Sequence, residues 1–199
     1  GAVIVHDLEE LKEALRSVAP EKVFFMGGEP TVAKELPELL AFAKQELGAV
    51  TRLGHTNGSR LPLEFLDGAN VGFKTWSPEL HRRITGRDKN LIYDNFAAAC
   101  DAGLEMAANM VYVPGLVELD EFEGTVQFLS RISPEIPFHI MGYIPVPGEP
   151  YRRPTDAEME QAEALCRTYL RHVASSHLTD AEALDLTCRD HRFRVRTVL

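Results

Sequence analysis

Cysteine is scarce in this sequence, and its spacing is unlike that of a metal site. The 199 residues contain three cysteines, Cys100, Cys166 and Cys188, which lie far apart in the chain. An odd number of cysteines in a protein that we expect to be cytoplasmic argues against a disulfide framework. Cys100 and Cys166 stand in helical patterns, where a thiol usually packs as a small apolar side chain. We therefore predict neither disulfides nor a metal site within this chain.

Long apolar runs and an excess of positive charge are also missing. No apolar stretch approaches the roughly 18 residues that a membrane-spanning helix requires, and we recognise no signal peptide. The formal net charge of −9 argues against general nucleic-acid binding, which needs a basic surface. Local exceptions to this negative charge are Arg152–Arg153 and the tail arginines at 189, 192, 194 and 196. We predict a cytoplasmic protein with no membrane or nucleic-acid partner.

Strand patterns alternate with helical patterns along most of the chain. The segments with a strand pattern are residues 23–26, 50–53, 70–76, 105–113 and 138–144. The segments with a helical pattern are residues 8–18, 33–47, 78–84, 90–102 and 122–129, and a long one that opens at Thr155 and includes Val173. This alternation predicts an α/β fold of parallel βαβ units. A barrel or partial barrel is favoured, and a doubly wound open sheet is the alternative.

We expect these elements to form one domain over residues 1–199, with the barrel in residues 1–150. Residues 151–199 would add the helix that opens at Thr155 and an arginine-rich strand at residues 192–196. In that strand arginines alternate with other side chains, which is typical of a half-exposed strand. We expect this segment to complete the barrel or to cover it.

The most informative motif is Lys-Val-Phe-Phe-Met-Gly-Gly-Glu-Pro-Thr, residues 22–31. An apolar strand there ends in Gly27 and Gly28, which let backbone groups approach a ligand with no Cβ in the way. Glu29 adds an acidic acceptor, and Pro30 suits the first turn of a helix. This combination predicts a cleft that binds a cation such as an ammonium group. An ordinary strand-to-helix turn with a surface glutamate is the alternative.

Polar residues also follow the other expected strands. They are His55, Thr56, Asn57, Lys74, Asn109 and Tyr143. In a parallel barrel the carboxyl ends of the strands meet at one mouth, so we expect these residues to converge on one ligand site. Asn57 followed by Gly58 is also a common turn, and His55 has a structural interpretation as a core or turn-capping residue. We assign no catalytic role to any residue.

These motifs together resemble the radical S-adenosylmethionine superfamily, and among its members most resemble the pyruvate formate-lyase activating enzymes. The resemblance extends over roughly residues 8–150. It is carried, in order, by residues 25–31, Thr56-Asn57-Gly58, Phe73-Lys74, His81, Thr85-Gly86, Asn90, Asn95, Val113-Pro114-Gly115 and Tyr143-Ile144-Pro145. The glycine-glycine-glutamate-proline motif is specific in this context. Each of the other motifs is weak by itself, but together they occur in the order that is typical of the family.

The resemblance implies a partial parallel (β/α) barrel in which a [4Fe–4S] cluster binds S-adenosylmethionine. Reductive cleavage would then give a 5′-deoxyadenosyl radical that abstracts hydrogen from a substrate. Gly27, Gly28 and Glu29 would accept the ammonium group of the methionine part, and Lys74 would pair with its carboxylate. By resemblance, Thr56, Asn57, Asn109 and Tyr143 would complete the cofactor-binding residues around the ribose and adenine.

The sequence departs from the family in the cluster loop. The Cys-x3-Cys-x2-Cys loop that follows the family's first strand is not found, and the three cysteines lie too far apart to replace it. We expect a truncated form that lacks the first strand and the cluster loop; a natural protein without a cluster is the alternative. The parent would bind the cluster and take electrons from a donor such as flavodoxin or ferredoxin. A glycyl radical enzyme is one candidate for its unknown substrate.

Smaller departures bear on the subclass. Activating enzymes usually have acidic residues where this chain has His55 and Gly72, and Ile144 replaces a common histidine. Glycyl-radical activation is therefore one hypothesis among several. A Schiff-base lyase would use Lys74 as a nucleophile activated by desolvation. A non-catalytic partner-binding module would use the arginines at residues 192–196. No histidine spacing typical of a metal-dependent hydrolase is found.

Overall fold

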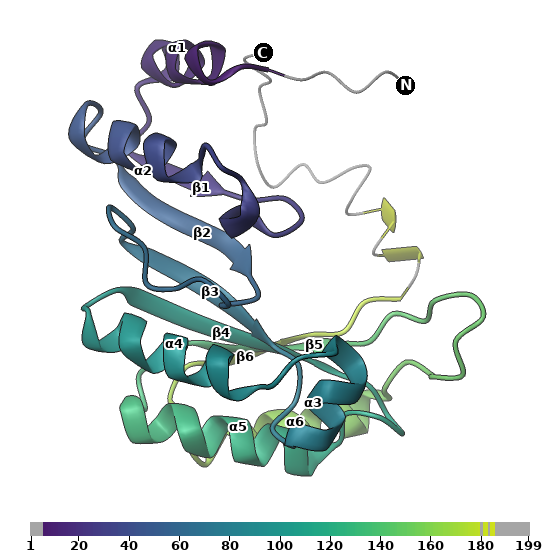
Figure 1. Cartoon of the computed structure of the whole chain (residues 1–199). Coiled ribbons are helices and arrows are strands. Elements are labelled where there is room, and N and C mark those ends of the chain that lie inside the picture. The colour runs from purple at the N-terminus through teal and green to yellow at the C-terminus, as the bar shows by residue number, and fades with distance from the viewer. Residues whose placement is uncertain (1–5, 180, 183, 186–199) are drawn as a thin grey trace.

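The computed structural model describes residues 6–179, 181–182 and 184–185. In this part of the chain six strands form one sheet, in the spatial order β1-β2-β3-β4-β5-β6, and every neighbouring pair is parallel (Figure 1). The strands are β1 (Lys22–Phe25), β2 (Val50–Thr56), β3 (Gly68–Phe73), β4 (Glu105–Tyr112), β5 (Phe138–Gly142) and β6 (Val173–Ser176). The predicted parallel α/β architecture is confirmed.

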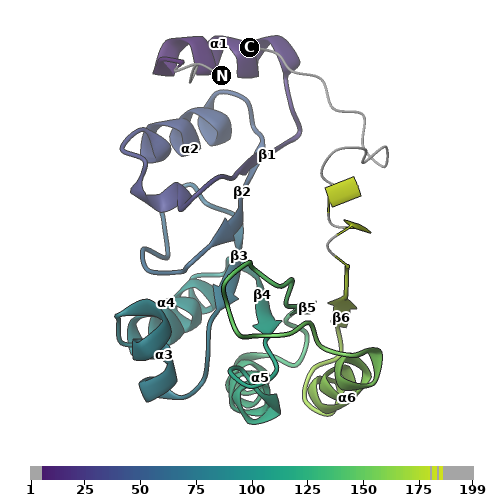
Figure 2. The same cartoon turned by 90° about the vertical axis from the view of Figure 1, so that its right-hand side faces the viewer.

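Helices connect the strands and cover one side of the sheet. They are α1 (Leu8–Val18), η1 (Pro30–Val32), α2 (Leu36–Gln45), α3 (Pro78–Thr85), α4 (Asn90–Asp101), α5 (Leu119–Ile132) and α6 (Asp156–Arg167). Figure 2 shows them along the outer, convex side of a curved sheet, and none of these helices lies on its concave side. Within the described residues, β1 and β6 are the two edges of the sheet. The molecule is therefore an open partial barrel.

Two helices begin with a capping box, a pattern that local sequence can specify. The Asp7 side chain accepts a hydrogen bond from the Glu10 backbone N–H at 2.9 Å, and Glu10 accepts one from the Asp7 N–H at 3.0 Å. Thr155 and Glu158 make the same reciprocal pair at the start of α6. Each pair satisfies backbone donors that the first helical turn leaves unused. These two helix starts are thus fixed by local sequence.

The alternation of side chains along β4 separates the core from the concave face. Met106, Ala108 and Met110 belong to the buried core that the helices share, together with residues such as Phe122 and Phe96. Because successive side chains of a strand point to opposite faces, the intervening residues face the interior of the barrel. Asn109 is one of these, so a buried amide lies on the concave face.

Two predicted boundaries are wrong. The last helix does not include Val173, because α6 ends at Arg167 and Val173 opens β6, in register with Phe138 of β5. The bond from the Phe138 N–H to the His172 carbonyl, 2.8 Å long, joins the two segments. The helix expected at residues 33–47 forms as the shorter α2 (Leu36–Gln45), and a separate 3-10 turn, η1 (Pro30–Val32), precedes it. The expected strand at residues 192–196 lies outside the described residues, as does Cys188.

Among the described residues, no helix combines the length and the apolar composition that crossing a membrane requires.

Cys100 and Cys166 are free thiols in helices, and Cys166 is buried. Burial raises the pKa of Cys100 to about 11 and that of Cys166 to about 12, with smaller effects from Asp101 and Glu163. Since the thiolate is the reactive form, we expect iodoacetamide at pH 7.5 to leave both largely unlabelled in the native protein. Peptide mapping by mass spectrometry would measure this, and unfolding in guanidinium should restore labelling. Rapid native labelling of Cys166 would contradict its burial.

Candidate functional site

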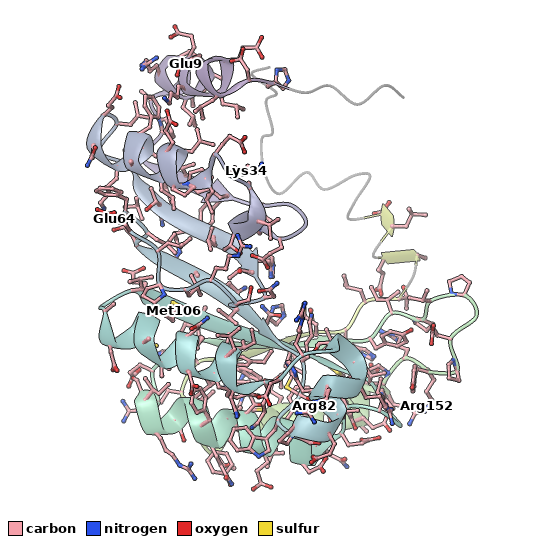
Figure 3. The ribbon with its side chains drawn as sticks, viewed as in Figure 1. Glu9, Lys34, Glu64, Arg82, Met106 and Arg152 are labelled. Atoms are coloured by element: carbon pink, nitrogen blue, oxygen red, sulfur yellow. The ribbon has the colours of Figure 1, made fainter. Side chains whose placement is uncertain are left out.

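The carboxyl ends of the strands lie at one end of the molecule. In Figure 3, Arg82 on α3 and Arg152 in the loop after β5 lie near this end, whereas Met106 at the start of β4 lies at the other. The loops that leave β1, β2 and β3 also begin here, and they carry most of the residues predicted for the ligand site. The carboxyl ends of the strands therefore lie along one edge, as expected of parallel strands.

Gly27 and Gly28 follow β1 in conformations that other residues rarely adopt. Their φ angles are +109° and +26°, and both residues are exposed. A Cβ built on either glycine would meet no heavy atom within 4 Å. The glycines are thus required by backbone geometry, while the space beside them is open to a ligand.

Glu29 lies at the centre of the predicted site, but it does not point freely into the cleft. Its Oε1 accepts hydrogen bonds from the Thr31 N–H at 3.2 Å, the Thr31 hydroxyl at 2.7 Å and the Thr56 hydroxyl at 2.7 Å. Its Oε2 accepts one from the Asn57 N–H at 2.6 Å. A carboxylate offers about four lone-pair sites, two on each oxygen, so one site on Oε2 stays available.

These bonds set the charge of Glu29. Burial raises its pKa, but the hydrogen bonds from Asn57, Thr56 and Thr31 outweigh burial and hold the pKa below its ordinary value. Glu29 is therefore ionised at neutral pH and ties the loop after β1 to the end of β2.

Asn57 and Gly58 form a turn and also border the site. The Asn57 side-chain oxygen accepts a bond from the Ser59 N–H at 2.8 Å, and Gly58 has a φ of +76°. The Asn95 side chain, from α4, donates to the Gly58 carbonyl at 2.9 Å. The turn interpretation of these residues is thus correct. Asn57 also lines the cavity described next.

A cavity of about 650 Å³ opens beside the end of β3. Asn57, Gly72 and Lys74 line its inner side, whereas Glu29 is not among its lining residues. A Cβ built on Gly72 would lie 4.0 Å from the Lys74 ammonium. Lys74 is exposed, so the desolvation that a Schiff-base lysine requires is not provided here. Asn57 is the residue that borders both Glu29 and the Lys74 cavity.

Asn109 lies on the concave face next to these residues. Only 3% of its surface is exposed, and its amide nitrogen donates to the Asn70 side chain at 2.8 Å. Its side-chain oxygen would be 3.4 Å from a Cβ on Gly72, so the Asn109 amide lies directly beside that glycine. His55 approaches the Asn109 amide at 3.5 Å, and its side chain is exposed rather than part of the core.

His139, in register with Asn109 on β5, is the second histidine of this concave face. Burial lowers its pKa, and His55 lowers it further. A histidine whose charged form is disfavoured, beside the Asn109 and Asn70 amides, gives this part of the concave face a hydrogen-bonding character.

Tyr143 lies apart from the other predicted residues. Its N–H donates to the Tyr112 carbonyl at 3.0 Å, and its hydroxyl accepts from the Val146 N–H at 3.2 Å. Its ring meets that of Tyr151 edge-on at 6.4 Å. Tyr143 thus fixes the start of the loop after β5, and it does not line the Lys74 cavity.

One residue that positions the site carries no signal in the sequence. Glu121, in the first turn of α5, is 7% exposed, and its Oε2 accepts bonds from the N–H groups of Trp76 at 2.5 Å and Ser77 at 2.7 Å. Tyr93 donates to the Thr75 carbonyl in the same loop at 3.0 Å. The loop that begins with Lys74 is therefore held from α4 and α5. In the sequence, Glu121 resembles an ordinary acidic residue at a helix start.

The residues described here do not fit an iron–sulfur cluster. Within residues 6–179 and the few described beyond, no group of three or more His, Cys, Asp or Glu side chains could hold a metal ion. Cys100 and Cys166 lie on different helices, and burial disfavours the thiolates that ligation requires. The same finding gives no support to a metal-dependent hydrolase.

The features of the β1–β3 exits do fit part of S-adenosylmethionine. The open glycine backbone and the remaining acceptor site on Glu29 suit an ammonium group. Lys74 offers a cation in the neighbouring cavity, which Asn57 borders and Glu29 does not line. This fit concerns the head group of the ligand alone.

Comparison with known proteins agrees with this geometry. A candidate glycyl-radical enzyme activating enzyme of Methanocaldococcus jannaschii is 26% identical over 179 residues, which cover 85% of this chain and 68% of the relative. A domain of pyruvate formate-lyase-activating enzyme from Bacteroides vulgatus superposes with a TM-score of 0.63 at 16% identity, covering 79% of this chain and 99% of that one.

Streptococcus suis SuiB superposes with a TM-score of 0.68 at 16% identity, covering 96% of this chain and 47% of SuiB. SuiB has also been crystallised with S-adenosylmethionine and with its precursor peptide SuiA. These structures share the partial-barrel fold. The family profile described as the radical SAM superfamily matches residues 1–129, more than half of the sequence. The chain therefore belongs to the radical SAM superfamily.

Proposed function

We propose that this chain is the S-adenosylmethionine-binding part of a radical enzyme similar to the activating enzymes. The observation that carries the proposal is the set of four hydrogen bonds that fixes Glu29 between the glycines after β1 and the end of β2. Such a carboxylate is charged and preorganised, so an ammonium group could bind it without further rearrangement.

In a radical enzyme, bound S-adenosylmethionine supplies a 5′-deoxyadenosyl radical that abstracts hydrogen from the substrate. The residues of this chain would bind and orient the cofactor. The Gly27 and Gly28 carbonyls and Glu29 would hold the ammonium, and Lys74 would pair with the carboxylate. Thr56 and Asn57 would fix the position of Glu29. Asn109, and the backbone near Tyr143, would face the ribose and adenine.

We further propose that a [4Fe–4S] cluster of the whole protein is held by cysteines outside these 199 residues. The spacing of the three cysteines in the sequence supports this, because cluster ligation needs closely placed thiolates. An electron donor such as flavodoxin or ferredoxin would then serve the whole protein. By itself this fragment would be inactive in radical chemistry.

For the substrate we propose a protein, with a glycyl radical enzyme as the first candidate. The name of the Methanocaldococcus jannaschii relative supports this class, as does the peptide bound to SuiB. The neutral concave face around Asn109, Asn70 and His139 is compatible with backbone amide groups. We propose a cytoplasmic location, in line with the cofactor's reducing chemistry.

The proposal is tested by titrating S-adenosylmethionine into the 199-residue chain in a calorimeter. We expect binding, and we expect Lys74→Gln to weaken it by about tenfold, since one charge-assisted contact contributes roughly 1.5–3 kcal/mol. Lys34→Gln is the matched control, because Lys34 is an exposed lysine on the segment between η1 and α2 (Figure 3). Equal affinity of the Lys74→Gln variant and the parent chain would contradict the assigned role of Lys74.

A further inference from the structure

The Lys74 cavity extends well beyond the residues proposed for the cofactor. Its outer side is built by α3, by the turn after α3 and by the first turn of α4. It is lined there by His81, Thr85, Arg87, Asp88, Leu91 and Ile92. None of these residues has a part in the proposed function, so this half of the cavity requires its own explanation.

Positive charge is concentrated around this cavity, although the whole chain has a formal charge of −9. Lys74, Arg60 and Arg87 all line it. Among the described residues, no hydrogen bond or ion pair engages the side chains of Lys74 and Arg87. Arg60 uses one guanidinium N–H on the Thr31 carbonyl, at 3.0 Å, and keeps the others. Unpaired guanidinium groups are the usual partners of carboxylates and phosphates.

The one carboxylate of the lining is already used. Asp88 pairs with Arg82 at 3.3 Å through one oxygen and accepts the Asn90 N–H at 2.8 Å through the other. It therefore neutralises Arg82, which does not line the cavity, and not Arg87. The cavity keeps a net positive charge.

His81 adds a buried acceptor to this positive cavity. The residue is 4% exposed, and its Nδ1 lies 3.0 Å from the Arg87 carbonyl. The Thr85 hydroxyl lies 3.1 Å from the same Nδ1, but it donates its proton to the His81 carbonyl at 2.8 Å. Since the Arg87 carbonyl can only accept, Nδ1 carries the ring proton, and Nε2 of the uncharged ring is an acceptor. Within the described part of the chain no hydrogen bond to Nε2 is found and no buried side-chain nitrogen lacks a partner, so Nε2 is open to the cavity that the ring borders. It suits an O–H or N–H donor of a ligand.

We propose that this cavity is a second ligand site, which binds a small molecule carrying a carboxylate or phosphate together with a nearby hydroxyl or N–H donor. Arg87 and Arg60 bind the anion, and His81 Nε2 accepts from the donor. Leu91 and Ile92 provide an apolar wall beside them. The site goes beyond the proposed function and does not depend on it, because Arg87 and His81 take no part in binding S-adenosylmethionine.

The test is calorimetric titration of the 199-residue chain with sn-glycerol 3-phosphate, D-glycerate and inorganic sulfate. The first two carry an anion and a hydroxyl, and their comparison decides between phosphate and carboxylate. We expect Arg87→Gln to lower the affinity for the better ligand by about tenfold. His81→Asn keeps a donor for the Arg87 carbonyl but removes Nε2. It should weaken the hydroxyl-bearing ligands by about threefold or more and leave unchanged the binding of inorganic sulfate, titrated as an anion without an O–H donor.

Arg83→Gln is the matched control, since Arg83 is an exposed arginine of α3 that does not line the cavity. If Arg83→Gln weakened anion binding as much as Arg87→Gln does, the proposed site would be wrong. It would also be wrong if the chain bound neither sn-glycerol 3-phosphate nor D-glycerate. S-adenosylmethionine is titrated in the presence and absence of the better anion. Unchanged cofactor affinity supports a separate site, and full competition overturns it. A chain that binds the anion but no S-adenosylmethionine would refute the proposed function alone.

Discussion

Glu29→Gln is expected to weaken S-adenosylmethionine binding by about 10- to 100-fold and to destabilise the fold by about 1–3 kcal/mol. The amide cannot reproduce both carboxylate oxygens. If its oxygen accepts from Thr31 and Thr56, its NH2 group faces the Asn57 N–H, which now lies 2.6 Å from Oε2. Two donors then oppose each other, and the negative charge for the ammonium group is lost. Calorimetry and urea unfolding measure the two effects.

Glu35→Gln serves as the control, because Glu35 precedes α2, is exposed and makes no side-chain capping bond. It should change neither quantity measurably. If Glu29→Gln bound the cofactor as tightly as the parent chain, the ammonium-binding role of Glu29 would be wrong. Lost stability with unchanged binding would leave Glu29 as a purely structural link between β1 and β2.

The pH dependence of stability provides a second readout of Glu29. Its pKa is lower in the folded protein than in the unfolded chain, so its contribution is fully present above the unfolded pKa of about 4.3. This contribution is lost as the pH falls through the folded pKa. The difference in unfolding free energy between the parent chain and Glu29→Gln should therefore shrink as the pH falls from the unfolded pKa of Glu29 through its folded pKa.

Glu121→Ala is expected to destabilise the protein by about 2–5 kcal/mol and to weaken cofactor binding as well. The substitution leaves the Trp76 and Ser77 N–H groups without their acceptor in a partly buried loop. It also removes the negative charge near Lys89, whose ammonium lies 3.3 Å from the Trp76 ring centre and whose pKa is lowered by burial. Because this loop begins at Lys74, its loosening should reduce the order of the cofactor site.

Glu121→Gln separates the acceptor from the charge. Both N–H groups bond to the same carboxylate oxygen, and a glutamine oxygen can replace it. We expect Glu121→Gln to keep more than half of the stability that Glu121→Ala loses, as measured by urea unfolding. Equal damage from the two substitutions would show that the charge near Lys89 matters more than the two hydrogen bonds.

Local sequence predicted the elements well where the pattern was strong. Both capping boxes form, and five strands were located, because these features depend on residues only a few positions apart. The strand β6 was missed because its four residues, Val-Ala-Ser-Ser, have no clear alternation. Its pairing with the edge of β5 creates it, and an edge is a property of the assembled sheet.

Gly124 shows the same limit within a helix. Helix propensity alone favours alanine at such an interior position of α5. In the fold, a Cβ at Gly124 would lie 2.2 Å from the ring of Trp76, so glycine is needed for that ring to pack. No pattern in the neighbouring sequence reveals this contact between α5 and the loop after β3.

The sequence by itself determined the family, the alternation of strands and helices, and the glycine-rich turn that ends at Glu29. Tertiary structure decided that the Glu29 carboxylate holds Thr56 and Asn57, 27 and 28 residues away, and that Glu121 anchors a loop 45 residues away. It also decided which cations share one cavity. The physical reason is range: propensity and periodicity act over a few residues, whereas these contacts exist only once distant segments pack together.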